Sequence, residues 1–541
     1  MPASVPPRNE PVNEYRPGSR ERASLRATLD QMQGGAPHAL RQRIAGAAVD
    51  GGGPPLQVRA PHRRDLVLGE VHQASSDDVR RAVDAALAAW RDWSVASWET
   101  RAAVFLRAAD LLGGPWRDRL NAATILGQSK SVHQAEIDSA CELIDFWRWN
   151  VHFASRLADD QPVSPPGVWN RLEMRPLEGF VLAITPFNFT SIAGNLPTAP
   201  AILGNTVVWK PATTQLLAAH VIIGLLEDAG LPPGVINLVA GPGAAVSEAA
   251  LNHPALAGIH FTGSTDTFQH LWRTVSANLD TYRGYPRLVG ETGGKDFVLA
   301  HPSAADDALL VGVLRGAFEY QGQKCSAASR AYIPESVWSR LKEPLAEATE
   351  SIRMGDPTDF STFMGAVIDE PSYRKHEEVL RAARDDPHLR LVAGGEADES
   401  VGWFVRPTIF ETDDPHHELM RRELFGPILT VFPYRDSEWT SVLATVDGTS
   451  PYALTGAVFA TDRRAVEEAL VALRHAAGNF YVNDKPTGAV VGQQPFGGAR
   501  LSGTNDKAGS HLNLLRWVSA RAIKETFVPS TSWRYPHQEP D

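Results

Sequence analysis

Between residues 179 and 300, short apolar runs alternate regularly with segments of helical periodicity, and few folds accept that pattern. The apolar runs at 179–184, 206–210, 235–239 and 258–261 predict strands, and 213–229, 244–252 and 265–279 predict helices. Fully apolar strands that alternate with helices indicate a parallel sheet covered by helices on both faces. Such sheets bind ligands at the carboxyl ends of their strands.

The flanking regions continue the α/β pattern. A helix is expected from Asp77 to about Trp93, because Ser75 and Asp78 resemble a capping box and apolar residues follow at helical spacing. A longer helical stretch is expected over 133–158. A second alternating region covers roughly 296–498. The chain is therefore expected to hold two α/β bodies.

Three segments are expected to lie outside these bodies. Residues 1–20 are rich in Pro, Asn and Glu and predict an extended arm. The polar, Pro-rich segment 160–176 predicts a hairpin that leaves the body of the subunit. The tail after residue 503 carries Trp517, Trp533 and Tyr535, which either mark a subunit contact or pack within the chain.

Composition excludes several classes of protein. The net charge of −11 argues against general nucleic-acid binding, which needs a basic surface. Two cysteines in 541 residues form no disulfide framework and show no metal-ligand spacing, so a reducing compartment and no metal are expected. No apolar run reaches the roughly 18 to 20 residues that span a bilayer, and the first residues show no signal pattern. A cytoplasmic protein without membrane association is expected.

Two segments carry candidate catalytic groups. Cys325 lies in Gly322-Gln-Lys-Cys-Ser-Ala327, where Lys324 would favour the reactive thiolate, although a free cysteine is more often a buried apolar residue. The second cysteine, Cys141, is expected to be such a core residue. Glu291 lies between glycines in residues 288–295, where it is either a turn residue or a general base whose pKa burial would raise.

Three further segments follow predicted strands. Asn188 comes directly after the strand 179–184 and is either an ordinary turn residue or an amide donor to an oxyanion. Lys210 ends the next strand, where it would reach ribose hydroxyls. Ser264 begins a helix, whose N-terminus would hold a phosphate. The first strand is not followed by Gly-x-Gly-x-x-Gly, so ordinary motif scanning would miss a dinucleotide site.

Taken together, these segments resemble the aldehyde dehydrogenase superfamily. The order is Pro-Phe-Asn at 186–188, Trp-Lys-Pro at 209–211, Phe-Thr-Gly-Ser at 261–264, Glu with Gly-Gly-Lys at 291–295, Gly-Gln-Lys-Cys at 322–325, Glu-Leu-Phe-Gly-Pro at 423–427 and Pro-Phe-Gly-Gly at 495–498. Longer stretches, among them 317–327, 477–485 and 487–498, are similar to one branch of it, the glutamate γ-semialdehyde dehydrogenases. The resemblance covers nearly the whole chain from about residue 20.

The resemblance implies a role for each matching position. Cys325 is the nucleophile, Asn188 and the Cys325 backbone N–H hold the oxyanion, and Glu291 activates water. The implied cofactor is NAD, although Thr213 stands where many NAD-preferring relatives have Glu. The positions implied for the cofactor are Pro186, Phe187, Lys210, Gly263, Ser264, Glu423 and Phe425.

The resemblance also implies how the substrate binds. Ser326 and the backbone N–H groups of Gly488 and Ala489 would hold its carboxylate, and Glu142 would face its ammonium group. Phe189 and Phe496 would sandwich the methylene chain, with plain core packing as the alternative. Some relatives have Ser at the position of Ala489, which weakens only the side-chain part of this anchor.

The fold implied is the α/β aldehyde dehydrogenase fold in three parts. They are a Rossmann-like NAD-binding domain (1–158 and 177–296), an α/β catalytic domain (297–498), and a small β oligomerisation flap with the C-terminal tail (159–176 and 499–541). The implied reaction is NAD-dependent oxidation of glutamate γ-semialdehyde in proline catabolism. A homodimer or higher homo-oligomer is expected, and proline dehydrogenase is a candidate partner. The alternatives are another acidic semialdehyde, such as succinic semialdehyde, and a non-catalytic homologue.

Overall fold

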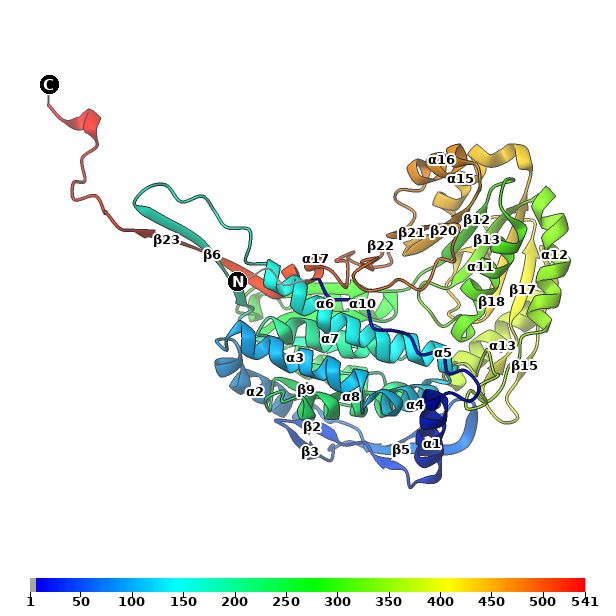
Figure 1. The fold of residues 1–541 in the computed structure, drawn as a ribbon, viewed down its shortest axis with the longest axis horizontal. Coiled ribbons are helices and arrows are strands. Elements are labelled where there is room, and N and C mark those ends of the chain that lie inside the picture. The colour runs from blue at the N-terminus through cyan, green and yellow to red at the C-terminus, as the bar shows by residue number, and fades with distance from the viewer. Residues whose placement is uncertain (1–5, 541) are drawn as a thin grey trace.

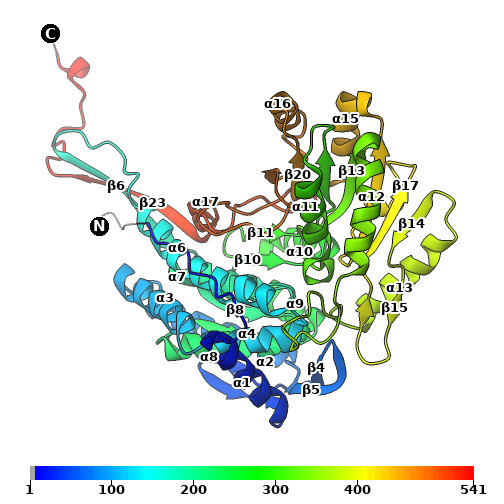
Figure 2. The same cartoon turned by 45° about the vertical axis from the view of Figure 1, so that its right-hand side comes forward.

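The computed structural model describes residues 6–540. Figure 1 shows two α/β bodies side by side and a ribbon that projects away from them, with the C-terminal end beyond it. Figure 2 shows the same separation from a second direction. Within the described residues, no helix is both long enough and apolar enough to cross a membrane. The predictions made for residues 1–5 and 541 concern positions outside the described residues.

The first body is built on a seven-stranded sheet of order β11-β10-β7-β8-β9-β2-β3. The first five strands in that order are parallel, and β2 and β3 extend the sheet in antiparallel fashion. The strands are β7 (Phe180–Ile184), β8 (Thr206–Lys210), β9 (Ile236–Leu238), β10 (Leu256–Thr262), β11 (Arg287–Glu291), β2 (Gln42–Ile44) and β3 (Ala47–Val49). All four predicted strands are present, displaced at their ends by at most two residues.

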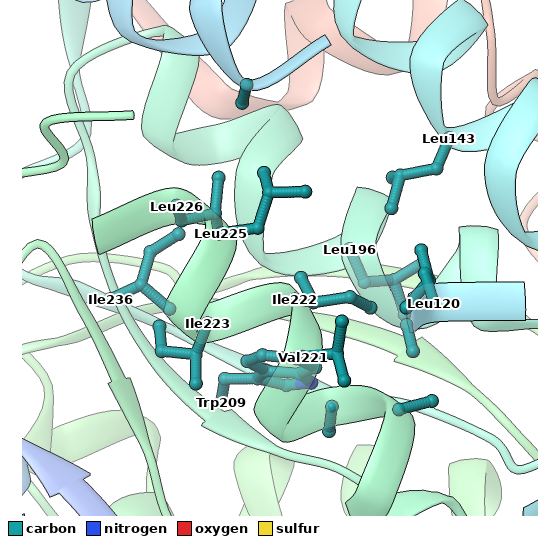
Figure 3. Packing of buried hydrophobic residues seen from close by; sticks show 14 of the residues in the cluster. Leu120, Leu143, Leu196, Trp209, Val221, Ile222, Ile223, Leu225, Leu226 and Ile236 are labelled. Atoms are coloured by element: carbon teal, nitrogen blue, oxygen red, sulfur yellow. The ribbon is translucent and has the colours of Figure 1, made fainter. Parts of the chain in front are cut away.

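Helices cover both faces of this sheet, as expected. Phe180 and Leu182 of β7 pack into one apolar cluster, while Val181 and Ala183 pack into another on the opposite face. Figure 3 shows part of the latter cluster, where Trp209 lies among apolar side chains of several helices. The helices of this body are α1 (Arg20–Gly34), α2 (Ser76–Trp93), α3 (Trp98–Gly113), α4 (Arg117–Gln128), α5 (Val132–Ala135), η1 (Glu136–Cys141), α6 (Glu142–Arg156), α7 (Thr190–Ile202), η2 (Thr213–Gln215), α8 (Leu216–Asp228), α9 (Gly243–Leu251), α10 (Thr265–Ala277) and η3 (Leu279–Thr281).

Local signals account for several of these elements. The Ser75 and Asp78 side chains form the predicted capping box at the start of α2. The long helix expected over 133–158 is present as α5, η1 and α6, and η1 is a π-helical segment. A smaller sheet of order β1-β5-β4, with β1 (His38–Ala39), β4 (Pro55–Ala60) and β5 (Arg63–His72), completes the first body.

The second body is built on a sheet of order β14-β17-β18-β13-β12-β20-β21. All its neighbouring strands are parallel except β14. The strands are β12 (Asp296–Ala300), β13 (Ala328–Pro334), β14 (Leu389–Ala393), β17 (Thr408–Thr412), β18 (Ile428–Tyr434), β20 (Thr455–Phe459) and β21 (Asn479–Val482); the short pairs are β15 (Ala397–Asp398) with β16 (Phe404–Val405) and β19 (Tyr452–Ala453) with β22 (Ala499–Arg500). The helices are α11 (Asp306–Phe318), η4 (Glu319–Gly322), α12 (Glu335–Glu350), α13 (Glu370–Arg384), α14 (Glu418–Arg421), η5 (Asp436–Glu438), α15 (Trp439–Thr449) and α16 (Arg463–Ala472).

The projecting ribbon corrects one expectation. Residues 160–176 leave the body as predicted, but they close no hairpin on themselves. Instead β6 (Val168–Pro176) pairs antiparallel with β23 (Val518–Thr526). The chain reaches β23 through α17 (His511–Leu514) and η6 (Leu515–Trp517), which directly precede it. A last 3₁₀ turn, η7 (Pro536–Gln538), lies near the end of the chain.

The three aromatic residues of the tail were predicted either to mark a subunit contact or to pack within the chain, and they differ in exposure. Trp517 is fully buried, and its ring lies 4.7 Å from that of His260, so it packs within the chain. Trp533 and Tyr535 are 81% and 67% exposed. The expected extended arm is present in its described part, because residues 6–16 contain no helix or strand.

Candidate functional site

Four predicted site residues lie at the carboxyl ends of adjacent strands in the first sheet. Asn188 follows β7, Lys210 ends β8, Ser264 follows β10 and Glu291 ends β11. These four strands are neighbours in the order β11-β10-β7-β8. The sheet therefore gathers at one edge side chains that are up to 103 positions apart in sequence (188 to 291).

Cys325 opens into a cavity of about 270 Å³ between the two bodies. The cysteine comes three residues after η4, on the second body, while Phe189 and Ile192 reach the cavity from the first. All six positions predicted for the substrate line this cavity: Glu142, Phe189, Ser326, Gly488, Ala489 and Phe496. The structure thus brings the predicted nucleophile and the predicted substrate contacts together.

The environment of Cys325 favours the neutral thiol. Burial raises its pKa well above the usual value, and the carboxylates of Asp296, Glu423 and Glu291 raise it further. Lys324, which we expected to favour the thiolate, instead pairs with Glu319 at 3.1 Å. The thiol therefore needs a proton acceptor before it can attack.

Glu291 lies close enough to Cys325 for its charge to act on the thiol. Its Oε2 accepts a hydrogen bond of 2.9 Å from the Gly498 backbone N–H. Burial raises the pKa of Glu291 well above the usual value, while this hydrogen bond and the charge of Lys507 oppose the rise. This rise is in the direction that we expected from burial, and a raised pKa suits a carboxyl group to work as a general base.

Asn188 approaches the nucleophile from the other body. Its side chain is buried, and its Nδ2 donates a 3.0 Å hydrogen bond to the carbonyl oxygen of Gln323, two residues before Cys325. Asn188 and Glu291 do not line the cavity itself. Asn188 contacts the segment that carries the cysteine, and the charge of Glu291 acts on the thiol. The sulfur, the amide and the carboxyl group of the predicted site therefore lie in the same region of the structure.

The residues predicted to bind the substrate make different contacts with their neighbours. The Ser326 hydroxyl and the Thr487 hydroxyl lie 2.8 Å apart. Glu142 Oε2 accepts a 2.6 Å hydrogen bond from the Ser191 hydroxyl, and burial, followed by the charge of Asp138, raises the pKa of Glu142 to about 8. Phe189 lies over the Lys130 ammonium group at 4.5 Å.

The predicted cofactor positions gather beside this cavity. Ser264 and Glu423 line a second, more open pocket of about 560 Å³. The Phe187 and Phe425 rings meet edge to face at 5.8 Å. Glu423 Oε1 accepts a 2.9 Å hydrogen bond from the Gly294 backbone N–H, which ties it to the loop after Glu291.

This second pocket fits a dinucleotide. The Ser264 side chain caps α10, so the N-terminus of that helix, which favours phosphate, opens at the pocket beside Gly263. A side chain at Gly293 would collide with the Glu423 carboxylate, at 2.1 Å for an added Cβ, so glycine leaves Glu423 its space. Pro186 and Lys210 lie at the same edge of the sheet, beyond β7 and at the end of β8.

Sequence reasoning missed part of the cavity wall. Asn9, Glu10 and Val12 of the N-terminal arm line it, as do Asp138 and Asp145. The two aspartates lie on the same helical stretch as Glu142, at helical spacing, so that signal was available. The arm carried no such signal, because an extended polar segment does not reveal where it docks.

The comparisons with known proteins agree with this geometry. Residues 49–523 match the model of the aldehyde dehydrogenase family. The chain belongs to the aldehyde dehydrogenase family. As an aldehyde dehydrogenase it has the fold expected from the sequence, with two mainly parallel sheets and the nucleophile between the two bodies.

Relatives of this aldehyde dehydrogenase share nearly its whole length. It is 48% identical over 540 residues, with 99% of this chain and 96% of the relative covered, to a protein of Dictyostelium discoideum named delta-1-pyrroline-5-carboxylate dehydrogenase, mitochondrial. A solved structure of the delta-pyrroline-5-carboxylate dehydrogenase of Mycobacterium tuberculosis, bound with NAD, is 57% identical and has a TM-score of 0.96, with 100% of each chain covered. Proline utilization A from Bdellovibrio bacteriovorus is 29% identical, with a TM-score of 0.91; the match covers 97% of this chain and 54% of that one.

Proposed function

We propose that this aldehyde dehydrogenase oxidises L-glutamate γ-semialdehyde, formed by hydrolysis of pyrroline-5-carboxylate, to L-glutamate with NAD, as the second step of proline catabolism. The observation that carries the proposal is the cavity at Cys325, because a nucleophile and the residues for a carboxylate and an ammonium group line the same space. The relative and the solved structure named for this reaction cover the chain almost completely.

NAD, held beside the cavity, would supply the acceptor for the hydride that leaves the aldehyde carbon. Ser264 and Gly263, at the start of α10, would hold its phosphates. Lys210 and Glu423 would hold the two riboses, with Pro186, Phe187 and Phe425 around the nicotinamide end. The apolar contact of Phe187 with Phe425 keeps water from that end.

The chain's own residues carry the covalent steps. The Cys325 thiol gives its proton to the Glu291 carboxylate, whose charge acts on it, and Glu291 passes that proton to solvent. The thiolate then adds to the aldehyde carbon, and the Asn188 amide and the Cys325 backbone N–H donate to the resulting oxyanion. One such donor contributes about 3 kcal/mol to lowering the barrier. Loss of hydride converts the thiohemiacetal into a thioester, and Glu291 takes a proton from the water that hydrolyses it, which releases the acid and the thiol.

The remaining predicted substrate residues would bind the end of the substrate that carries the α-carboxylate and the α-ammonium group. The Ser326 hydroxyl and the backbone N–H groups of Gly488 and Ala489 would bind the α-carboxylate. Glu142 would face the α-ammonium group. Phe189 and Phe496 would enclose the methylene chain. Succinic semialdehyde has no ammonium group, so it would make no ion pair with Glu142.

The organisation of the chain is part of the proposal. We take 1–158 with 177–296 as the NAD-binding domain, 297–498 as the catalytic domain, and 159–176 with 499–541 as the oligomerisation part. The change of sheet between β11 and β12 supports the division near residue 296. The projecting ribbon supports a homodimer or larger homo-oligomer, because a two-stranded ribbon is marginally stable by itself.

Location and partner complete the proposal. We place the protein in the cytoplasm, supported by two unpaired cysteines; cell fractionation tests this, since the Dictyostelium relative is named as mitochondrial. The match to about half of the longer proline utilization A chain supports a separate partner enzyme that supplies the substrate, with proline dehydrogenase as the candidate.

Steady-state NADH production tests the function. We expect kcat/KM for glutamate γ-semialdehyde to exceed that for succinic semialdehyde at least tenfold, and NAD to be preferred over NADP. Cys325→Ala should abolish turnover and leave NAD binding intact, because it removes the proposed nucleophile. Cys141→Ala is the matched control and should retain turnover, since the Cys141 sulfur is held by hydrogen bonds with Arg117 Nη2 at 3.3 Å and with the Pro11 carbonyl oxygen at 3.7 Å.

Three results would contradict the proposal. Substantial turnover by Cys325→Ala would remove its nucleophile. A higher kcat/KM for succinic semialdehyde would change its substrate. NAD binding without NADH production from any aldehyde would indicate a non-catalytic homologue.

A further inference from the structure

Part of the cavity wall comes from the N-terminal arm, more than a hundred residues before the first residue implicated in the chemistry. Asn9, Glu10 and Val12 line the cavity together with Cys325. They belong to none of the motifs that identify the family. The contacts of Asn9 indicate what this wall does.

Asn9 joins the first body to the loop 487–491. Its Nδ2 donates to Asp145 Oδ2 on α6 at 2.8 Å and to the Val491 carbonyl oxygen at 2.7 Å. Its Oδ1 accepts from Gln493 Nε2 at 3.1 Å. All the hydrogen-bonding groups of one short amide side chain are therefore directed to α6 and to the end of the loop that carries Gly488 and Ala489.

Glu10 fixes the arm on which Asn9 lies. The Glu10 backbone N–H donates to Asp145 Oδ1 at 2.8 Å. Its carboxylate accepts from Arg117 Nη1 and from Arg148 Nη1, each at 2.7 Å, and Arg117 also donates to the Pro11 carbonyl oxygen at 2.7 Å. The Glu10 side chain is only 12% exposed, so these charge-assisted bonds are shielded from water.

The loop turns at two glycines. Gly488 and Gly492 both have positive φ angles, of 95° and 82°, and Gly488 is exposed. Backbone N–H groups bind a carboxylate well only when they are held in the required orientation before the ligand arrives. The bond from Asn9 to the Val491 carbonyl holds the loop between these two glycines.

We propose that Asn9 is a positioning residue for substrate specificity: it clamps the loop 487–491 against α6 so that Gly488 and Ala489 hold the carboxylate end of the aldehyde substrate. The inference rests on the proposed function, because it deepens the role given there to the loop. It assigns the N-terminal arm a part in selecting acidic aldehydes over neutral ones. The bond-making steps at Cys325 do not depend on it.

The test compares two aldehydes with the full-length enzyme and saturating NAD. Asn9→Ala and Asn9→Asp should each raise KM for glutamate γ-semialdehyde about tenfold, the effect of one or two lost hydrogen bonds, with kcat within twofold of the unchanged enzyme. Asn9→Asp should show the larger effect, because its carboxylate cannot donate and faces the oxygens of Asp145 and Val491. KM and kcat for hexanal, which has no carboxylate, should stay within twofold.

Controls separate this effect from a general loss of structure. Glu14→Gln changes an exposed residue of the same arm, whose side chain pairs with Arg16, and should leave both KM values unchanged. Gln493→Ala removes only the donor to Asn9 Oδ1 and should raise KM for the semialdehyde by a smaller factor in the same direction. Should Asn9→Asp fail to fold, Asn9→Ala and Gln493→Ala carry the test.

The outcomes separate a failure of the proposed function from a failure of the role given to Asn9. An unchanged enzyme that does not oxidise glutamate γ-semialdehyde would overturn the proposed function. If the wild-type enzyme oxidises glutamate γ-semialdehyde but the Asn9 and Gln493 variants keep their KM for it within twofold, the role of Asn9 alone would be overturned. Equal losses for hexanal and the semialdehyde would also overturn it, since they would indicate a purely structural arm.

Discussion

The carboxyl group of Glu142 makes this cavity sensitive to pH. Glu142 is held among Asp138, Asp145 and the Ser191 hydroxyl, and burial raises its pKa to about 8. A raised pKa means that the group is mostly neutral below pH 8 and charged above it. In the proposed complex the substrate ammonium group binds the charged form of Glu142, so we expect the affinity of the site for the semialdehyde to follow this titration.

The effect is measurable as the pH dependence of KM. Between about pH 7 and pH 9 we expect KM for glutamate γ-semialdehyde to fall as Glu142 loses its proton. Glu142→Gln, which keeps an acceptor for Ser191, should raise KM at pH 9 about tenfold and flatten this dependence. Because both enzymes are assayed in the same substrate solutions, the hydration and ring-closure equilibria of the substrate cancel in the ratio. An identical slope in the two enzymes would exclude the ammonium contact.

At the scale of elements, a left-handed turn positions Cys325, the proposed nucleophile. Tyr320, Gln321 and Gly322, all in η4, have φ angles of 51°, 55° and 63°. Side chains other than glycine adopt this region at a cost of about 1–3 kcal/mol each. An added Cβ at Gly322 would also lie 2.3 Å from the Gly426 carbonyl oxygen. The turn that delivers Cys325 is therefore packed directly against the segment that carries Glu423 and Phe425.

Gly322→Ala tests this packing. We expect the free energy of unfolding to fall by about 2 kcal/mol or more, and kcat to fall at least tenfold because Cys325 shifts relative to Asn188. Chemical denaturation and steady-state kinetics measure the two effects. Gly448→Ala is the matched control: no atom lies within 4 Å of the added Cβ in α15, and both properties should stay unchanged. Wild-type stability and kcat in Gly322→Ala would show that the turn tolerates a side chain.

At the scale of the whole molecule, the ribbon of β6 and β23 and the tail beyond it stand away from both bodies (Figures 1 and 2). Exposed apolar residues gather there: Trp169, Phe527, Val528, Trp533 and Tyr535. Apolar side chains concentrated on a projecting segment are typical of a surface that another chain covers. The residues that line the catalytic cavity all precede this tail in sequence.

Removing the tail should therefore weaken assembly without removing catalysis. A chain that ends at Thr526 keeps the ribbon and loses residues 527–541, which include the exposed Phe527, Val528, Trp533 and Tyr535. We expect sedimentation equilibrium to show a dissociation constant at least tenfold higher than that of the full chain, with kcat per site within threefold. Tyr285→Ser, which removes an aromatic residue that is 86% exposed on the first body, should leave assembly unchanged. Equal masses for the full and shortened chains at all concentrations would exclude the tail from the interface.

Four adjacent strands of the first sheet, β10, β7, β8 and β9, were predictable from the sequence, whereas β11, β2 and β3 were not predicted. The sequence also named the candidate site residues, through the family resemblance. The strand β8 and the helix α2 appear almost at their predicted bounds, because buried parallel strands and capped amphipathic helices carry local signals. Cys325, Asn188 and Glu291 were identified by their order among family motifs. Local sequence patterns and family resemblance are enough to predict an element when a few neighbouring residues determine its structure.

Only the tertiary structure decided the rest, because it depends on which distant surfaces meet. The partner of the strand 168–176 is a strand 350 positions later, paired residue for residue from Val168 with Thr526 to Pro176 with Val518. Lys324 turned to Glu319 because a buried ammonium group needs a buried carboxylate. Asn9 reached the catalytic cavity through contacts with Asp145 and Val491. A hydrogen bond between residues hundreds of positions apart leaves no periodicity in the sequence, so its partners are known only once the chain has folded.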